Sequence, residues 1–110
     1  MSVHKDHTGT LWVGTDNDGI YAVTPDKTPK VHFSPTDNTH SVPATIMSIF
    51  EDSNHNMWIG SYLNGMAKLD TKTGRCEYLK LVDETSNLME NVYCFAEDNN
   101  KTLWIGTMGG

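Results

Sequence analysis

The chain has 110 residues, enough for a single domain, and carries 14 acidic against 8 basic side chains, for a formal net charge of −6. Its Lys and Arg residues are scattered rather than clustered, so the composition argues against a nucleic-acid partner, whose phosphates need a basic surface. No apolar run approaches the ~20 residues of a membrane-spanning helix, and residues 1–6 lack the pattern of a signal peptide, so we expect no direct membrane insertion.

Short stretches rich in β-branched and aromatic residues alternate with turn-forming residues along the chain. They predict strands near residues 3–6, 11–15, 20–24, 30–33, 46–51, 57–61, 66–70, 76–80, 92–97 and 103–107. The breaks between them, such as Asn64-Gly65, are typical of tight antiparallel connections, and a longer connection is expected at 82–91. A helix at residues 77–101 is the alternative, because good helix formers occur there, but its apolar positions do not keep a 3.6-residue period.

All three tryptophans, Trp12, Trp58 and Trp104, stand 46 residues apart, and their surroundings recur in register. Each has an Asp six positions before it and a Gly two positions after it, namely Asp6, Asp52, Asp98, Gly14, Gly60 and Gly106. Four strands in each 46-residue unit are typical of a propeller blade, since propeller repeats run from about 40 to 50 residues. The sequence therefore predicts an all-β chain, a β-propeller fragment of about two and a half four-stranded antiparallel blades: blade one at 1–45, blade two at 46–91 and the first half of blade three at 92–110.

The recurring residues have structural roles in this interpretation. A tryptophan on the second strand of a blade is large and flat enough to pack between adjacent blades. We expect Trp58 to be well buried there, so that Trp58→Ala costs about 3–5 kcal/mol of stability. The glycine after the tryptophan lets a neighbouring group come close. The aspartate before the tryptophan accepts hydrogen bonds from backbone N–H groups of the first turn.

Cysteine and histidine give no sign of a disulfide, a metal site or a catalytic centre. Cys76 falls on the outer strand of blade two and Cys94 on the inner strand of blade three, about three strand spacings of ~4.8 Å away, so we expect no bond between them. The histidines do not recur at the repeat period and fall mostly in turns, so we interpret them as surface residues: His4, His7, His32, His40 and His55. We expect no metal and no cofactor.

The segment EDSNHNMWIGSYLNGMAKLDTKTG, with EDNNKTLWIGT behind it, resembles the two-component regulator propeller repeat, in which an acidic pair, a polar turn and an aliphatic residue precede Trp-Ile/Val-Gly-Thr. The resemblance covers essentially the whole chain, but residues 61–65 read Ser-Tyr-Leu-Asn-Gly where a Thr and a run of Gly are usual. It implies a periplasmic sensor domain of a bacterial transmembrane receptor. Many such receptors are hybrid two-component systems with a histidine kinase, and in gut bacteria they often respond to oligosaccharides released from complex glycans.

The same resemblance implies that this chain is a non-catalytic ligand-sensing or binding segment. In propellers, the turns between second and third strands share one face with the connections between blades. That face would carry Asp16, Asn17, Asp18, Tyr62, Asn64 and residues 83–91. Tyr62 could stack on a sugar and the carboxamides could bond hydroxyl groups, whereas the other interpretation is that all of them are ordinary turn residues.

Two other functions stay open. A protein-interaction scaffold is one, because propellers often serve as one and a fold does not determine a function. A glycan-active enzyme is less favoured, because no nucleophile with an oriented base and no Gly-rich phosphate loop is suggested. A calcium loop beginning at Asp16-Asn17-Asp18-Gly19 lacks its closing Glu, since Lys27 stands there.

The expected number of blades also predicts the partners of the chain. A propeller closes only with several blades, so two and a half blades imply remaining blades in a longer parent chain. The strand at 103–107 would expose unpaired backbone groups, which recruit other strands. We therefore expect the isolated chain to self-associate.

Overall fold

The computed structural model describes residues 2–24, 30–36, 40–79 and 90–107, and in these ranges the chain forms ten strands and no helix. They are β1 (Ser2–Lys5), β2 (Leu11–Gly14), β3 (Ile20–Val23), β4 (Lys30–Phe33), β5 (Ile46–Glu51), β6 (Met57–Ser61), β7 (Met66–Leu69), β8 (Cys76–Leu79), β9 (Val92–Glu97) and β10 (Leu103–Thr107). Every strand begins and ends within one residue of its predicted position, so the all-β prediction is confirmed. Within these ranges there is accordingly no helix of the length and apolar character that crossing a membrane requires.

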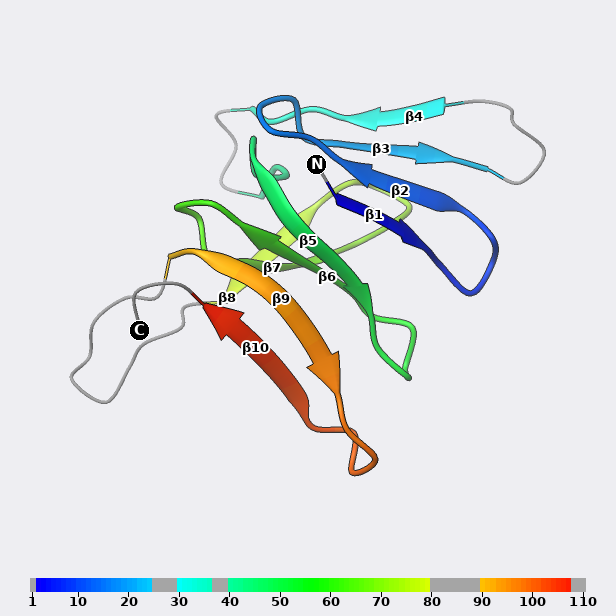
Figure 1. Ribbon diagram of the computed structural model, residues 1–110. Coiled ribbons are helices and arrows are strands. Elements are labelled where there is room, and N and C mark those ends of the chain that lie inside the picture. Colours follow the sequence, from blue (N-terminus) through cyan, green and yellow to red (C-terminus); the bar gives the residue numbers. More distant parts are fainter. Residues whose placement is uncertain (1, 25–29, 37–39, 80–89, 108–110) are drawn as a thin grey trace.

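The strands form three antiparallel sheets that follow one another along the chain (Figure 1). The strand order is β1-β2-β3-β4 in the first sheet and β5-β6-β7-β8 in the second, and the third pairs β9 with β10. The recurring tryptophans hold equivalent register positions on the second strand of each sheet, opposite His4, Phe50 and Ala96. The sheets are successive blades of a β-propeller, and the third contributes two described strands.

The first strands of the three blades lie next to one another, whereas the outer strands diverge (Figure 1). β5 contacts β1 and β2 of the blade before it, and β9 contacts β5 and β6. At the junction of the first two blades, the Ile46 N–H donates to the carbonyl oxygen of Thr15 at 2.8 Å. Each blade therefore begins against the first two strands of the preceding blade.

The recurring aspartates close the first turn of each blade through both carboxylate oxygens. Oδ1 accepts the backbone N–H groups two and four positions later, at 2.9–3.0 Å in all three turns. Oδ2 accepts the indole N–H of the tryptophan in the same blade: Trp12 to Asp6 at 2.8 Å, Trp58 to Asp52 at 3.0 Å, and Trp104 to Asp98 at 3.0 Å. The indole bond, which the sequence analysis did not foresee, explains why the aspartate and the tryptophan recur together.

These hydrogen bonds determine the protonation of the aspartates. Partial burial works to raise the pKa of Asp6 and Asp52, but the bonds from the indole and the turn outweigh it, so both pKa values lie below the usual value. At Asp98 the indole bond of Trp104 is the largest cause, and its pKa is lowered as well. The carboxylates are therefore held in the charged form that the turns need.

The hydrophobic core lies between the first two blades. Trp12 is 3% exposed and packs there against a cluster that includes Ile20, Ile46 and Ile59. Phe33, from the outermost strand of the first blade, stacks beside the Trp12 ring with centroids 6.3 Å apart. Both blades thus contribute apolar side chains to one shared interface, as expected for a tryptophan packed between blades.

Each recurring tryptophan is buried more deeply when more of the following blade is present to cover it. Trp12 faces a blade with four described strands and is 3% exposed, whereas Trp104 is 59% exposed. Trp58 is half-buried. The expectation that Trp58 is well buried is therefore wrong for the described part of the chain, because β9 and β10 supply only part of the surface that covers Trp12 in the first interface.

The glycine after each tryptophan lies where other groups crowd the second strand. A methyl group on Gly60 would stand 2.5 Å from Ser48 Oγ and 2.7 Å from the carbonyl oxygen of Val92, the first residue of β9. On Gly106, among the residues that the structure describes, it would collide with the side chain of Cys94 alone. Close approach of the next blade is thus one physical reason for a glycine at this place in the repeat.

Cysteine placement follows the predicted strands. Cys76 is buried at the start of β8, the outermost strand of the second blade, and Cys94 is exposed in β9, the innermost strand of the third. The two thiols are not bonded to each other. Burial raises the pKa of the Cys76 thiol to about 12, so it is an unreactive part of the core.

Candidate functional site

The two turns expected to carry ligand-binding side chains lie at the same edge of adjacent blades (Figure 1). Each closes through a backbone bond of 3.0 Å from the N–H of its first residue to the carbonyl of its glycine, Thr15 to Gly19 after β2 and Ser61 to Gly65 after β6. The N–H of each glycine also donates to the segment that enters the next blade, at 3.1 Å and 2.7 Å. The turns are therefore held in equivalent positions.

Thr45 joins these two turns. Its hydroxyl donates to the carbonyl oxygen of Asp16 in the first turn, and its own carbonyl oxygen accepts the N–H of Tyr62 in the second turn at 3.3 Å. The structure thus brings Asp16 and Tyr62 to the two sides of one residue. Thr45 is not predictable from the sequence, because a threonine before a strand has no distinctive pattern.

The Asp18 carboxylate is engaged within its own blade. Its Oδ2 accepts the Tyr21 hydroxyl at 2.6 Å, and its Oδ1 lies 3.5 Å from Nε2 of His32. The Tyr21 and His32 rings stack in parallel, with centroids 4.0 Å apart. The bond to Asp18, with smaller contributions from burial and charge, raises the Tyr21 pKa. Asp18 therefore holds an aromatic pair that the sequence analysis missed, although its signal was the direct pairing of the two residues across β3 and β4.

Tyr62 and Leu63 form an exposed apolar pair in the second turn. Tyr62 is 48% exposed, and Leu63 is exposed as well in a left-handed conformation with φ of 73°. The Leu63 N–H donates to Oδ1 of Asn91 at 2.9 Å, and Asn91 occupies the same place in the repeat as Thr45. The connection to each following blade thus holds the turn before it, and the Tyr62 ring stands out from a fixed backbone.

The remaining candidates lie on the same two turns. Asp16, Asn17 and Asn64 are all exposed, and the Asn64 N–H donates to Ser61 Oγ at 3.1 Å. Residues 83–89, also expected on this face, lie outside the described residues. The described face offers an aromatic ring, two amide side chains and acidic groups within two neighbouring turns.

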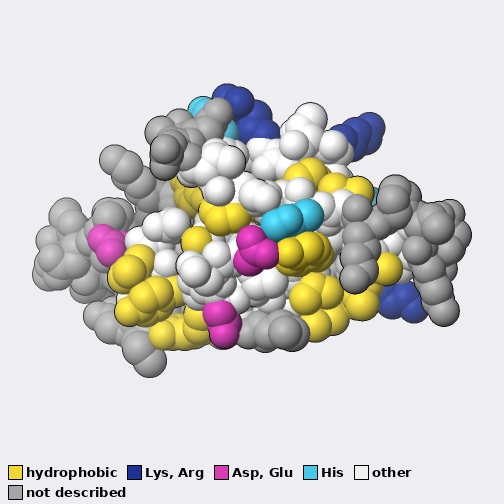
Figure 2. Space-filling view, turned by 90° about the horizontal axis from the view of Figure 1, so that it is seen from above, with side chains coloured by type: hydrophobic (Ala, Val, Ile, Leu, Met, Phe, Trp, Pro, Cys, Tyr) yellow, Lys and Arg dark blue, Asp and Glu magenta, His cyan; other side chains and the backbone are white. Residues whose placement is uncertain are grey.

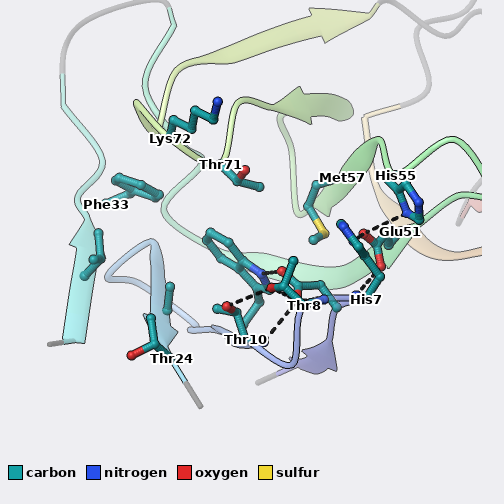
Figure 3. Close-up of a pocket in the computed structure, with 14 residues that line it drawn as sticks. His7, Thr8, Thr10, Thr24, Phe33, Glu51, His55, Met57, Thr71 and Lys72 are labelled. Atoms are coloured by element: carbon teal, nitrogen blue, oxygen red, sulfur yellow. Dashed lines mark hydrogen bonds and ion pairs between the residues drawn. The ribbon is translucent and has the colours of Figure 1, made fainter. Parts of the chain in front are cut away.

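A groove of about 270 Å³ lies at the opposite edge, between the first two blades (Figure 3). Its wall includes Trp12, Phe33 and Met57, and its rim carries polar side chains such as His7 and Lys72. The groove follows from the splaying of adjacent blades. Of the residues that the sequence analysis named as part of the repeat, Trp12 and its partner Asp6 line it.

Charge is spread thinly over the surface. On the face drawn in Figure 2, Lys and Arg side chains lie near the margin in separate groups, and an acidic and a histidine side chain lie next to each other among hydrophobic ones near the centre. This distribution follows from the scattered positions of the basic residues in the sequence.

Comparison with known proteins points to one family. The model of the two component regulator propeller matches residues 42–63 and 89–109. No curated protein sequence matches the chain significantly. Three similar solved structures are extracellular domains from B. thetaiotaomicron, and each of these similarities covers 96% of the chain.

Two of these structures are of the same protein, BT4673. One, described as part of a hybrid two component system, has a TM-score of 0.78 at 23% identity, and the other, described as part of a one component system, has a TM-score of 0.79 at 26% identity. The third, from the hybrid two component system BT3049, has a TM-score of 0.71 at 32% identity. The chain spans only 15%, 14% and 13% of these structures, so the similarity concerns a few blades of each.

Proposed function

Because the chain carries repeats of the two-component regulator propeller family, we propose that it is a ligand-sensing segment of a periplasmic sensor propeller and that its ligand is an oligosaccharide. The observation that carries the proposal is the turn face, on which Thr45 holds Asp16 and Tyr62 side by side at the junction of two blades. A ligand across this junction would contact both blades at once.

The chemistry of the face suits a neutral sugar. An exposed tyrosine offers a flat apolar surface together with a hydroxyl group, and Asn17 and Asn64 can both donate and accept hydrogen bonds. The acidic side chain of Asp16 and the net charge of −6 disfavour an anionic ligand. Neutral oligosaccharides are therefore the class that we propose.

The proposed role is binding rather than catalysis. The Asp18 carboxylate on this face is occupied by Tyr21 and His32. The description of the similar structures as extracellular domains of signalling systems supports a place in a transmembrane receptor. The output would then belong to a histidine kinase in the parent chain, and the remaining blades of that parent would cover the exposed Trp104.

Calorimetric titration of the 110-residue chain with neutral gluco-, manno- and xylo-oligosaccharides tests the proposal. We expect one of these series to bind, and Tyr62→Ala to weaken its binding at least about tenfold, equivalent to ~1.4 kcal/mol, through loss of the stacking surface. Asn54→Ala, an exposed residue in the turn at the opposite edge, is the matched control and should leave binding unchanged.

Three results would contradict the proposal. The first is a folded chain that binds none of the series, and the second is equal binding by the Tyr62→Ala and unsubstituted chains. Release of reducing sugar during the titration is the third, because it would show catalysis in place of sensing.

A further inference from the structure

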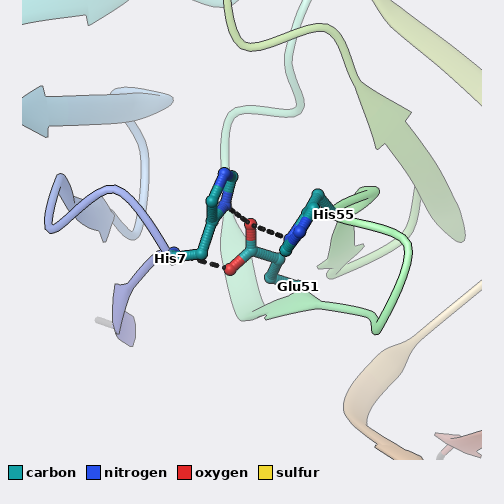
Figure 4. Close-up of side chains that lie close together, drawn as sticks. All are labelled: His7, Glu51 and His55. Carbon is teal, nitrogen blue, oxygen red and sulfur yellow. Dashed lines mark hydrogen bonds and ion pairs between the residues drawn. The ribbon is translucent and has the colours of Figure 1, made fainter.

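Two turns from different blades bring three metal-ligating side chains together at the mouth of the groove (Figure 4). His7 belongs to the turn after β1, His55 to the turn after β5, and Glu51 is the last residue of β5. One ligating atom of each lies within 4.8 Å of the others. In the part of the chain that the structure describes, no other group of three His, Cys, Asp or Glu side chains converges in this way.

Both imidazole rings direct Nδ1 at the same carboxylate oxygen (Figure 4). Oε2 of Glu51 is 2.5 Å from Nδ1 of His7 and 3.6 Å from Nδ1 of His55. The two rings stack with centroids 3.8 Å apart. The Glu51 side chain is only 10% exposed, whereas both rings are open to solvent. The carboxylate is therefore held in place by its surroundings, and the two histidine side chains have room to change their orientation.

The backbone positions this carboxylate independently of the imidazoles. The N–H of His7 donates to the other oxygen of Glu51, Oε1, at 2.8 Å. The N–H of His55 donates to the carbonyl oxygen of Asp52 at 3.0 Å, within the turn that the Asp52 carboxylate closes. Both histidines therefore project from turns whose geometry is determined by the repeat.

The next interface shows what this arrangement looks like without the histidines. Glu97 stands 46 residues after Glu51, and its oxygens accept the N–H and the hydroxyl of Ser53 at 3.0 Å and 3.1 Å. Ser53 is the counterpart of His7, and Lys101 is the counterpart of His55 with the same left-handed backbone, φ of 63° against 65°. A serine therefore makes the contact between blades equally well, so that contact does not by itself require an imidazole at either position.

We propose that His7, Glu51 and His55 bind a divalent transition metal ion of the zinc class, which links the first two blades. Two imidazole nitrogens and one carboxylate oxygen are a donor set that zinc takes in three-ligand sites with an open fourth position. Zinc distances of about 2.0–2.2 Å place such ligand atoms roughly 3.3 Å apart, so binding requires the two exposed rings to turn from the present arrangement, in which their Nδ1 atoms lie 2.5 Å and 3.6 Å from Oε2 of Glu51. Calcium and magnesium do not fit, because they prefer oxygen ligands.

Titration with zinc chloride alone tests this site, with every chain carrying Cys94→Ser to remove an exposed thiol that could compete for zinc. Serine already occupies the equivalent positions 2 and 48, so this background keeps the repeat. We expect one zinc ion per chain by calorimetry. His7→Ser and His55→Lys, which copy the residues of the next interface, should each weaken binding at least about tenfold, while Glu97→Gln should not.

A second measurement separates metal binding from folding. Saturating zinc should raise the urea midpoint of the unsubstituted chain and of Glu97→Gln, and should not move that of His55→Lys, because only the native site binds the metal. Circular dichroism tests whether each variant is folded. If His7→Ser is unfolded, the comparison with His55→Lys alone decides. The proposal is overturned if the chain binds no zinc, if His55→Lys binds it as tightly, or if Glu97→Gln loses binding to the same extent.

Discussion

Replacing the recurring tryptophans one at a time by alanine should destabilise the chain in the order Trp12, Trp58, Trp104. Trp12 is 3% exposed, so its replacement removes almost all of the ~150–250 Å² that a buried tryptophan contributes. At about 25 cal/mol per Å² the loss is about 4–6 kcal/mol, close to the ~3–5 kcal/mol typical of such changes in cores. Trp104 is 59% exposed, which leaves about two fifths of that area and a loss of about 1.5–2.5 kcal/mol as an upper value.

The indole hydrogen bond does not produce this order. Each of the three indoles donates to an aspartate Oδ2 at 2.8–3.0 Å, so alanine removes the same bond in every case. Replacing the same residues by phenylalanine removes the bond, worth about 1 kcal/mol, but keeps a smaller ring, so it should cost less than alanine at each position, with the largest added loss of packing at the buried Trp12. The difference between the two series therefore reports packing against the next blade.

Urea unfolding followed by far-ultraviolet circular dichroism measures both series without relying on tryptophan fluorescence. The measurement is made at two protein concentrations, so that any association through the Trp104 side is seen as a shift of the midpoint. Equal losses for the three alanine variants, or a larger loss for Trp104→Ala than for Trp12→Ala, would refute the idea that each tryptophan is stabilised by the blade that follows it.

Four further predictions follow from the same contacts. Gly60→Ala should destabilise the chain by about 1–3 kcal/mol in urea unfolding, because the added methyl meets the Val92 carbonyl, whereas Gly106→Ala should change stability by less than about 1 kcal/mol because the Cys94 side chain can rotate away. In the folded chain a thiol reagent should label Cys94 at once and Cys76 only on unfolding, and rapid labelling of both would contradict the buried position of Cys76. The lowered pKa values of Asp6 and Asp52 contribute stability that is complete above the unfolded pKa of about 3.9 and is lost as the pH falls through the folded values, so thermal unfolding should show acid destabilisation that Asp52→Ala reduces. The edge of β10 that pairs with no described strand should make the chain self-associate, and light scattering that finds a monomer at all dilutions would count against it.

Strand positions were predictable because each depends on its own residues. Turn-forming sequences such as Asn64-Gly65 and the Asp-rich turns act over a few positions. Because the pattern repeats every 46 residues, the first two strands of a blade are indicated three times in the sequence. Burial of Trp58 was not predictable in this way, because it depends on how much of another blade lies against it. The bond between each aspartate and its tryptophan had a visible signal, their constant separation of six residues, whose cause only the structure shows.

The His7–Glu51–His55 cluster was missed for a different reason. Contacts between neighbouring blades join residues 44 positions apart, as from His7 to Glu51 and from Ser53 to Glu97, and this offset is not apparent from the repeat length. The sequence analysis interpreted the histidines as surface residues because they do not recur. His7 and His55 are indeed exposed, but they face each other across the interface between blades.

In a repeat protein, residues that recur in every blade and positions at which the residue changes therefore indicate different roles. A residue that recurs in every blade, as Asp52 and Trp58 do, is needed wherever the backbone repeats, and its role is to build the blade. A glutamate recurs at positions 51 and 97 as the acceptor between blades, yet Glu51 lies beside two imidazoles whereas Glu97 accepts from Ser53, and a lysine with the same left-handed backbone stands where the second imidazole would be. Since folding is satisfied by either set, the difference is free to serve binding, and positions that are equivalent in structure but different in chemistry are where the specific function of a blade should be sought.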